Sequence, residues 1–205
     1  MKLALFPSLS FGLLTLGLLV GHARAQGPSK PEGAQTTPKP AARPADVASV
    51  ESIIAAVYDV ISGPAGQKRD WERMRSLFAP GARLIPTSPV RAPGAKPDAP
   101  LTGTEAYASN VLDVEGYITR SSKFLEEQGF FERETARRVE TYGHIAHVWS
   151  TYEARRKAED AEPFMLGINS IQLMNDGKRW WVVTIFWEAE TPRTPLPKEY
   201  LKSAP

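Results

Sequence analysis

Two segments near residue 50 and residue 75 repeat apolar side chains every three or four positions, which is typical of amphipathic helices. The first stripe comprises Val47, Val50, Ile54, Val57 and Ile61. We expect Asp46 to cap this helix and Gly63-Pro64 to end it. The second helix begins at Asp70 and ends before Pro80-Gly81, and its shared face comprises Trp71, Met74, Leu77 and Phe78.

A third helix is predicted over residues 104–128, because apolar side chains again fall on one side and Gly129 follows. From Phe130 the period changes to 2, which is typical of strands. The expected strands are 131–142, 144–156, 167–174 and 178–189, with an earlier one at 82–86. Asn175-Asp176-Gly177 predicts a hairpin turn before the last strand.

Residues 86–100 contain five prolines, which exclude a regular strand there. We expect a long exposed loop, followed by a short strand near residues 101–103. Helices and strands are otherwise segregated along the chain. The fold class is therefore α+β, with a largely antiparallel sheet and two or three helices covering one side of it.

The last strand is apolar on both faces, whereas a sheet with one wet face alternates apolar and polar side chains. One parity comprises Trp180, Val182, Thr184 and Phe186; the other comprises Trp181, Val183, Ile185 and Trp187. We therefore expect one face to line an interior and the other to meet a second sheet. The alternative is that the C-terminal tail covers Trp181 and Trp187 within the monomer.

The first 25 residues have the features of a secretory signal peptide: Lys2, an apolar run from Phe11 to Val20, and Ala23-Arg24-Ala25 as the cleavage site. Residues 26–45 are rich in proline and predict a disordered linker. The main domain is then expected over 46–190, with a Pro-rich tail over 191–205. The sequence thus predicts an exported protein, periplasmic or secreted.

Composition excludes several classes of function. The chain has no cysteine, which excludes a lipoprotein anchor, a thiol nucleophile and cysteine metal sites. Without Lys2 and Arg24, 25 − 2 = 23 basic residues balance 23 acidic ones. A neutral chain has no electrostatic attraction for nucleic acid or, after signal cleavage, for anionic membrane.

Three short runs resemble one known superfamily. They are Trp71 with Leu77–Ala82 (LFAPGA), the run Gly143–Glu153 (GHIAHVWSTYE), and Asp176–Trp180 (DGKRW). Together with the order of elements over residues 47–190, they resemble the nuclear-transport-factor-2-like superfamily, of the SnoaL-like type. The resemblance implies a cone, a cystatin-like roll in which a strongly curved antiparallel sheet wraps round the helices and is open at one end.

The same resemblance implies several kinds of function, because the superfamily includes isomerases, cyclases, dehydratases, binders and protein–protein adaptors. Its catalytic members usually place an Asp, Glu or His inside the cone. It also implies a homodimer through the outer sheet face, for which the second parity of the last strand provides Trp181, Val183, Ile185 and Trp187. No catalytic set of the family maps residue by residue onto this chain.

His147 is the candidate acid–base residue, because histidine titrates near neutral pH. A hydrogen-bonded sheet histidine is the favoured alternative. His144 lies three residues away and hence on the opposite face of a strand, so no metal site is predicted. Asn169 stands in the middle of a strand, where it either orients a ligand carbonyl or ties down a loop.

A hydrophobic pocket would draw on aromatic side chains, with the core as their default place. The candidate pocket residues are Tyr58, Trp71, Tyr117, Trp149, Asn169, Trp180 and Thr184. Alternation places Glu132, Glu134, Arg138 and Glu140 on one face of their strand. Charge pairing around Arg138 is favoured there over paired catalytic carboxylates.

The favoured function is binding of a small apolar ligand or of a protein partner, with no cofactor. The alternative is an acid–base enzyme of the isomerase, dehydratase or cyclase type, with His147 as the base and Asn169 as the orienting residue. The two differ in one feature, because an enzyme needs a pocket with a titratable group at its floor.

Overall fold

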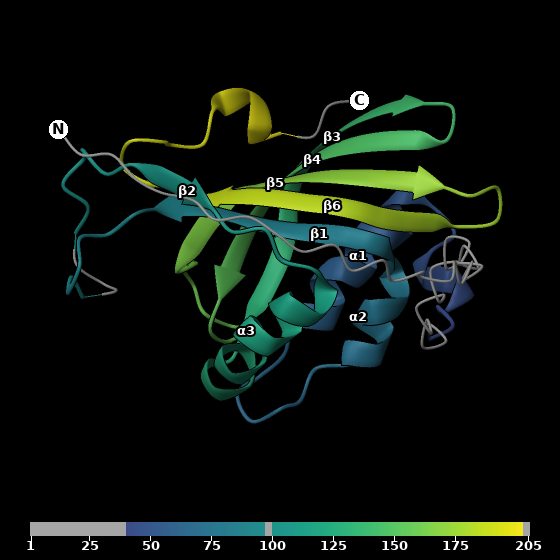
Figure 1. The fold of residues 1–205 in the computed structure, drawn as a ribbon, viewed down its shortest axis with the longest axis horizontal. Helices are drawn as coiled ribbons and strands as arrows, with labels where there is room; N and C mark the ends of the chain where they lie inside the picture. The colour runs from purple at the N-terminus through teal and green to yellow at the C-terminus, as the bar shows by residue number, and fades with distance from the viewer. Residues whose placement is uncertain (1–39, 97–99, 203–205) are drawn as a thin grey trace, which may run out of the picture. The chain divides into compact units, whose positions relative to one another are not determined.

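The computed structural model describes residues 40–96 and 100–202. The predicted signal peptide and most of the predicted linker lie outside the described residues. The described chain contains three α-helices and one six-stranded sheet (Figure 1). The helices are α1 (Val50–Ile61), α2 (Trp71–Leu77) and α3 (Val114–Gln128). The strands are β1 (Phe78–Pro89), β2 (Tyr107–Ser109), β3 (Phe131–Tyr142), β4 (Ile145–Arg155), β5 (Met165–Asn175) and β6 (Trp180–Ala189).

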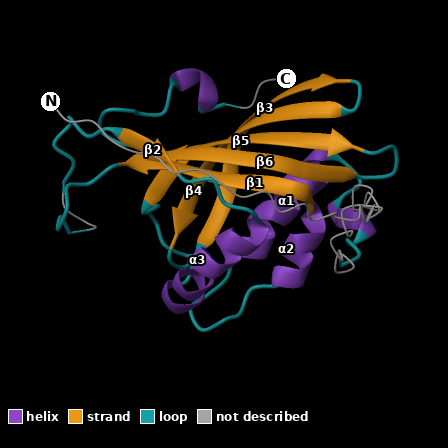
Figure 2. Ribbon diagram, in the orientation of Figure 1, coloured by secondary structure: helices purple, strands orange, loops and turns teal. Residues whose placement is uncertain are grey.

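The strands are ordered β2-β1-β6-β5-β4-β3, and the sheet bends over the three helices, which all lie on its concave face (Figure 2). The predicted α+β class and the curved sheet round three helices are confirmed. Neighbouring strands are antiparallel in every pair except β1 and β6, which run parallel to each other. The core fills the space between helices and sheet, with Ile53, Ile54, Leu77, Val148 and Ile171 all fully buried.

The helix starts follow from local capping. Ser49, not Asp46, caps α1, and it forms a capping box with Ser52. Asp46 instead accepts two hydrogen bonds from the Arg73 guanidinium, at 2.8 and 2.9 Å. Asp70 caps α2 as predicted, with its carboxylate accepting from the Arg73 backbone N–H. The first residue of α1 is therefore decided by the polar side chains of Ser49 and Ser52 rather than by the apolar stripe.

The four C-terminal strands occur close to the predicted ranges, and Asp176 closes the predicted turn by accepting from the backbone N–H groups of Lys178 and Arg179. Three predictions in the Pro-rich region were wrong. Prolines were expected to exclude a strand from residue 86 on, but β1 continues to Pro89, where it pairs with β2. The third helix begins ten residues later than expected, at Val114, where Asp113 caps it. The short strand lies at Tyr107–Ser109 instead of 101–103 and pairs with the end of a longer β1.

A β-bulge changes the faces of the last strand. Leu173 pairs with Val182 and Gln172 with Thr184, so Val183 is an extra residue in β6. Ile185 and Trp187 consequently pack against the core on the helix side, opposite to the outer face expected for them. Thr184 lies on the outer face and not in the interior. Only Trp181 and Val183 of the predicted interface lie on that outer face.

The segment after β6 folds back across the outer face of the sheet (Figure 1). The Thr151 hydroxyl donates a hydrogen bond to the Tyr200 carbonyl oxygen over 2.6 Å, and the Tyr200 ring lies 5.7 Å from the Trp149 ring. In the part of the chain that the structure describes, no helix is long and apolar enough to cross a membrane.

Candidate functional site: a buried carboxyl in the concave cavity

A cavity of about 180 Å³ lies between the helices and the concave face of the sheet. Its wall is apolar over most of its surface, with contributions from all three helices and from β1, β3, β4, β5 and β6. The apolar lining residues include Val57, Ile61, Met74, Phe78, Leu125, Phe130, Ile185 and Trp187. The polar lining residues are Tyr117, Ser121, Glu132, Tyr152 and Asn169. The cavity is therefore a hydrophobic chamber with a few polar groups that converge on it.

Glu132 brings a carboxyl group into this chamber from the start of β3. Burial raises the pKa of Glu132 to about 8, because the apolar surroundings disfavour the charged form. The hydrogen bond from the Asn169 side-chain amide, at 3.4 Å, acts in the opposite direction. Among residues 40–96 and 100–202, no ion pair involves Glu132. A carboxyl with this pKa can both give and take a proton near neutral pH.

Asn169 is held by a chain of hydrogen bonds with a defined direction. Ser150 donates to the Glu134 carboxylate at 2.5 Å, so its single proton is used there. Tyr58 must then donate to Ser150 across their 2.6 Å contact, and its oxygen accepts from the Asn169 amide at 3.0 Å. The second amide proton of Asn169 is directed to Glu132.

Glu134 is two residues from Glu132 and has a different environment. Its carboxylate receives two hydrogen bonds from the Nε of Arg137, at 2.9 and 3.0 Å, and one from Nη2 at 2.5 Å. Arg137 thus compensates the charge of Glu134, whereas Glu132 faces the cavity. The surroundings therefore give the two carboxyl groups of this strand different roles: Glu134 is held by Arg137 and Ser150, and Glu132 faces the cavity.

The buried tyrosines of this site stay protonated. Burial, together with the charge of Glu132, raises the pKa of Tyr58, Tyr117 and Tyr152 well above the ordinary value. Tyr117 lies edge-on to Trp187, with ring centroids 6.3 Å apart. Tyr117 and Tyr152 line the cavity and can present neutral hydroxyl donors to a bound molecule.

Three phenylalanines and one arginine lie at the end of the chamber where α3 meets the ends of β4 and β5. Phe124 and Phe130 line the cavity, and Phe164 lies 6.1 Å from Phe130. The Arg156 guanidinium stacks on Phe164 at 3.9 Å and on Phe124 at 5.0 Å. Its buried Nη1 has no hydrogen-bond partner among the described residues.

The structure brings three of the predicted pocket residues together: Tyr58, Tyr117 and Asn169. Trp71 and Trp180 pack against the core away from the cavity wall. His147 and Trp149 lie on the opposite, outer face with Thr184. There the His147 ring contacts Trp149 at 4.8 Å between centroids, and its Nε2 lies 2.9 Å from the Ser170 hydroxyl. His147 is thus far from the chamber in which Asn169 lies.

Sequence reasoning missed Glu132 because simple alternation grouped it with Arg138. A bulge at Thr135 breaks that alternation, since Glu134 pairs with Tyr152 and Ala136 with Thr151. The expected face was therefore wrong: Arg137 accompanies the glutamates inward, and Arg138 pairs with Trp149 on the outer face. One sequence signal could have indicated Glu132: Glu132 and Glu134 are two residues apart at the start of the predicted strand, so both point to the same face.

Metal binding finds no support within the described ranges, where no group of three or more His, Asp or Glu side chains is placed to hold an ion. The site has one carboxyl, one amide and tyrosine hydroxyls, which is a donor set for proton transfer and hydrogen bonding.

No protein-family model and no curated protein sequence matches the chain. Similar solved structures include a protein of unknown function with a cystatin-like fold from Nostoc punctiforme, at 14% identity and a TM-score of 0.48, covering 72% of this chain and 92% of that one. An NTF2-like protein of unknown function from Methylobacillus flagellatus is 17% identical with a TM-score of 0.38, covering 70% and 95%. A candidate ketosteroid isomerase from Shewanella frigidimarina is 12% identical with a TM-score of 0.41, covering 66% and 90%.

The first two are described as cystatin-like and NTF2-like, which is the group that the sequence resembles.

Proposed function

We propose that the concave cavity is a general acid–base site in which Glu132 transfers a proton on a small apolar carbonyl compound. The observation that supports this most directly is a carboxyl on the wall of an apolar chamber, with its pKa raised to about 8 and no ion pair within the described chain. General acid–base catalysis is most effective when the pKa lies near the working pH.

The chemistry that fits these groups is removal of a proton next to a carbonyl and its return at the same or another carbon. Glu132 is the proton carrier. The enolate oxygen that forms needs neutral donors, which the hydroxyls of Tyr117 and Tyr152 supply, while the Asn169 amide donates to Glu132 itself. Tyr58 and Ser150 fix the orientation of Asn169 through their hydrogen bonds.

The size of the chamber defines the substrate class. An apolar cavity of about 150 Å³ accommodates benzene, so 180 Å³ suits a molecule of roughly one ring. Apolar walls disfavour highly charged substrates. A compact cyclic or branched ketone is the class that we propose.

The experiment follows loss of deuterium from α-deuterated cyclohexanone by proton NMR, with and without the protein. We expect the intact protein to accelerate exchange, with a rate that rises with pH and levels off above about pH 8, where Glu132 is ionised. Glu132→Gln should lose at least roughly a hundredfold of this acceleration. Glu140→Gln removes an exposed carboxylate from the same strand and should leave the rate unchanged.

Equal rates for the intact protein and Glu132→Gln would contradict the proposal. Binding without exchange, measured by ligand-observed NMR, would instead favour the second function, a carrier for a small apolar molecule. The apolar lining of the chamber is the observation that favours that alternative. Export and a homodimer through the outer sheet face stay predictions, which fractionation and native mass spectrometry can test.

A further inference from the structure

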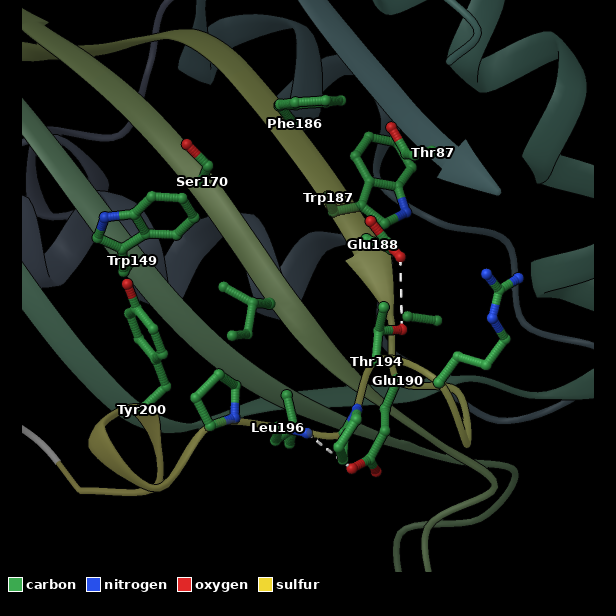
Figure 3. Close-up of a pocket in the computed structure, with 15 residues that line it drawn as sticks. Thr87, Trp149, Ser170, Phe186, Trp187, Glu188, Glu190, Thr194, Leu196 and Tyr200 are labelled. Atoms are coloured by element: carbon green, nitrogen blue, oxygen red, sulfur yellow. Dashed lines mark hydrogen bonds between the residues drawn. The ribbon is translucent and has the colours of Figure 1, made fainter. Parts of the chain in front are cut away.

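A second and larger cavity, of about 570 Å³, lies on the outer face of the sheet, beneath the chain that follows β6 (Figure 3). Its floor is the sheet and its roof is the segment 190–200. Three contacts hold the roof in place: the Thr151 hydrogen bond to Tyr200, the Tyr200–Trp149 ring contact, and a hydrogen bond from the Leu196 N–H to Glu190 at 2.9 Å. This volume lies within the range of sites for small organic ligands, roughly 300–1,000 Å³.

Aromatic rings form much of the wall. Trp149, Phe186 and Tyr200 come from β4, β6 and the returning segment, so the enclosure depends on the fold and not on one local sequence. Phe186 is 45% exposed, although it is a large apolar residue in the middle of a strand. Rings in such an arrangement attract cations through their electron-rich faces.

The charges of the same cavity are mainly negative. Glu188 and Glu190 line it, and neither forms an ion pair within residues 40–96 and 100–202. Within the described residues, Glu188 accepts one long hydrogen bond, of 3.5 Å, from the Thr194 hydroxyl (Figure 3). Arg193 is the cation of the lining, and it lies 3.9 Å from Glu105. A cationic ligand would therefore meet two carboxylates without a cation of their own.

One polar atom of the wall lacks a partner. The Thr87 Oγ1 is buried and has no hydrogen bond within the described chain. Buried polar atoms nearly always have a partner, so this hydroxyl at the cavity wall is available to a polar group of a bound molecule. Thr87 stands opposite Glu188 in the β1–β6 pairing, which places its hydroxyl near the same carboxylate.

From the aromatic wall, the two carboxylates and the unpartnered hydroxyl, we infer that this outer cavity binds a small organic cation, an amine or quaternary ammonium with an apolar body. The site is on the face of the sheet opposite to Glu132 and does not depend on the acid–base function proposed for that residue. On this inference, the segment 190–200 forms part of the binding site.

The test compares phenyltrimethylammonium with tert-butylbenzene, which has the same shape but no charge, by saturation-transfer NMR on the full chain. We expect saturable binding of the cation and at least roughly tenfold weaker binding of the neutral compound. Glu188→Gln should weaken the cation roughly tenfold and leave the neutral compound unchanged. Phe186→Leu, at a half-exposed position that tolerates substitution, should weaken both.

Two controls make the outcome decisive. Glu140→Gln makes the same charge change at an exposed position of β3 and should not alter cation binding. Glu132→Gln, in the concave cavity, should not alter it either. Equal affinity for both probes, no saturation up to about 10 mM, or full binding in Glu188→Gln would each overturn the inference. Loss of cation binding in Glu132→Gln would place the cation in the concave cavity and would overturn it as well.

Discussion

The Asn169 amide lies 3.4 Å from the Glu132 carboxyl and 3.0 Å from the Tyr58 hydroxyl oxygen, so one side chain joins the titratable group of the cavity to a buried hydrogen-bond chain. This relationship links residues that are 37 and 111 positions apart in the sequence. It makes the protonation of Glu132 a property of the folded state, with consequences for stability.

Stability should depend on pH through Glu132. Its pKa is about 8 when folded and near 4.5 when unfolded, so the folded state binds more protons between these values. The stability present below pH 4.5 is therefore lost as pH rises and is fully lost above pH 8. At about 1.4 kcal/mol per unit of pKa difference, the loss is at most about 5 kcal/mol.

Glu132→Gln removes this titration. Urea unfolding at pH 5, 6.5, 8 and 9 should show a flatter profile for the variant, which becomes more stable than the unmodified protein at pH 9. Glu140→Gln should retain the original slope, because that carboxyl is exposed. Parallel profiles for the Glu132 variant and the unmodified protein would refute the buried, titrating carboxyl.

Tyr58→Phe should destabilise the domain by about 1–3 kcal/mol, because Ser150 loses the donor to its hydroxyl oxygen and Asn169 loses one of its two acceptors. Adding Ser150→Ala should cost less than the sum of the two single changes, since both act on one bond. A double-mutant cycle in urea should give a coupling of about 1 kcal/mol or more. Tyr142→Phe removes a hydroxyl from a side chain that is 84% exposed and should change stability by less than about 0.5 kcal/mol.

Arg69 is a buried cation whose hydrogen bonds, among the described residues, all go to backbone carbonyls. Its guanidinium donates to the carbonyl oxygens of Ile61 at 2.9 Å, Gly63 at 2.6 Å and Leu125 at 2.8 Å, which joins the end of α1 to α3. Arg69→Met should cost about 3 kcal/mol or more, because several buried acceptors lose charged donors at once. Calorimetry should show the loss, with Arg120→Met on the exposed side of α3 as the neutral control.

The hydrophobic period was sufficient to predict α1, α2 and the four C-terminal strands, because in each the buried face repeats over at least two turns or three alternate positions. It was insufficient at Asp46 and Ser49, where either side chain can cap a helix and the contact with Arg73 decides between them. It also failed in the Pro-rich region, where neither period is present.

The candidate site residues were likewise predicted only in part. Tyr58, Tyr117 and Asn169 were predicted from residue type and lie at the cavity or its hydrogen-bond chain. Glu132 was grouped with Arg138, and Thr184 was placed on the wrong face, because a bulge interrupts the alternation of each strand. A bulge depends on pairing with the neighbouring strand, and no pattern within one strand reveals it.

The bulge at Val183 can be tested by deletion. Val183 and Thr184 together oppose Gln172, so deleting Val183 leaves Val182 and Ile185 on their present inner face and only regularises the ladder. We expect this variant to fold with a loss of about 1–2 kcal/mol in urea unfolding. Deleting Phe186 offers the matched control, since it removes one residue from a regular part of the same strand. That deletion shifts the alternation by one residue, so either Trp187 moves from the core to the outer face or Ile185 does. It should therefore abolish cooperative unfolding. Equal damage from the two deletions would show that the faces of β6 are not decided by the extra residue.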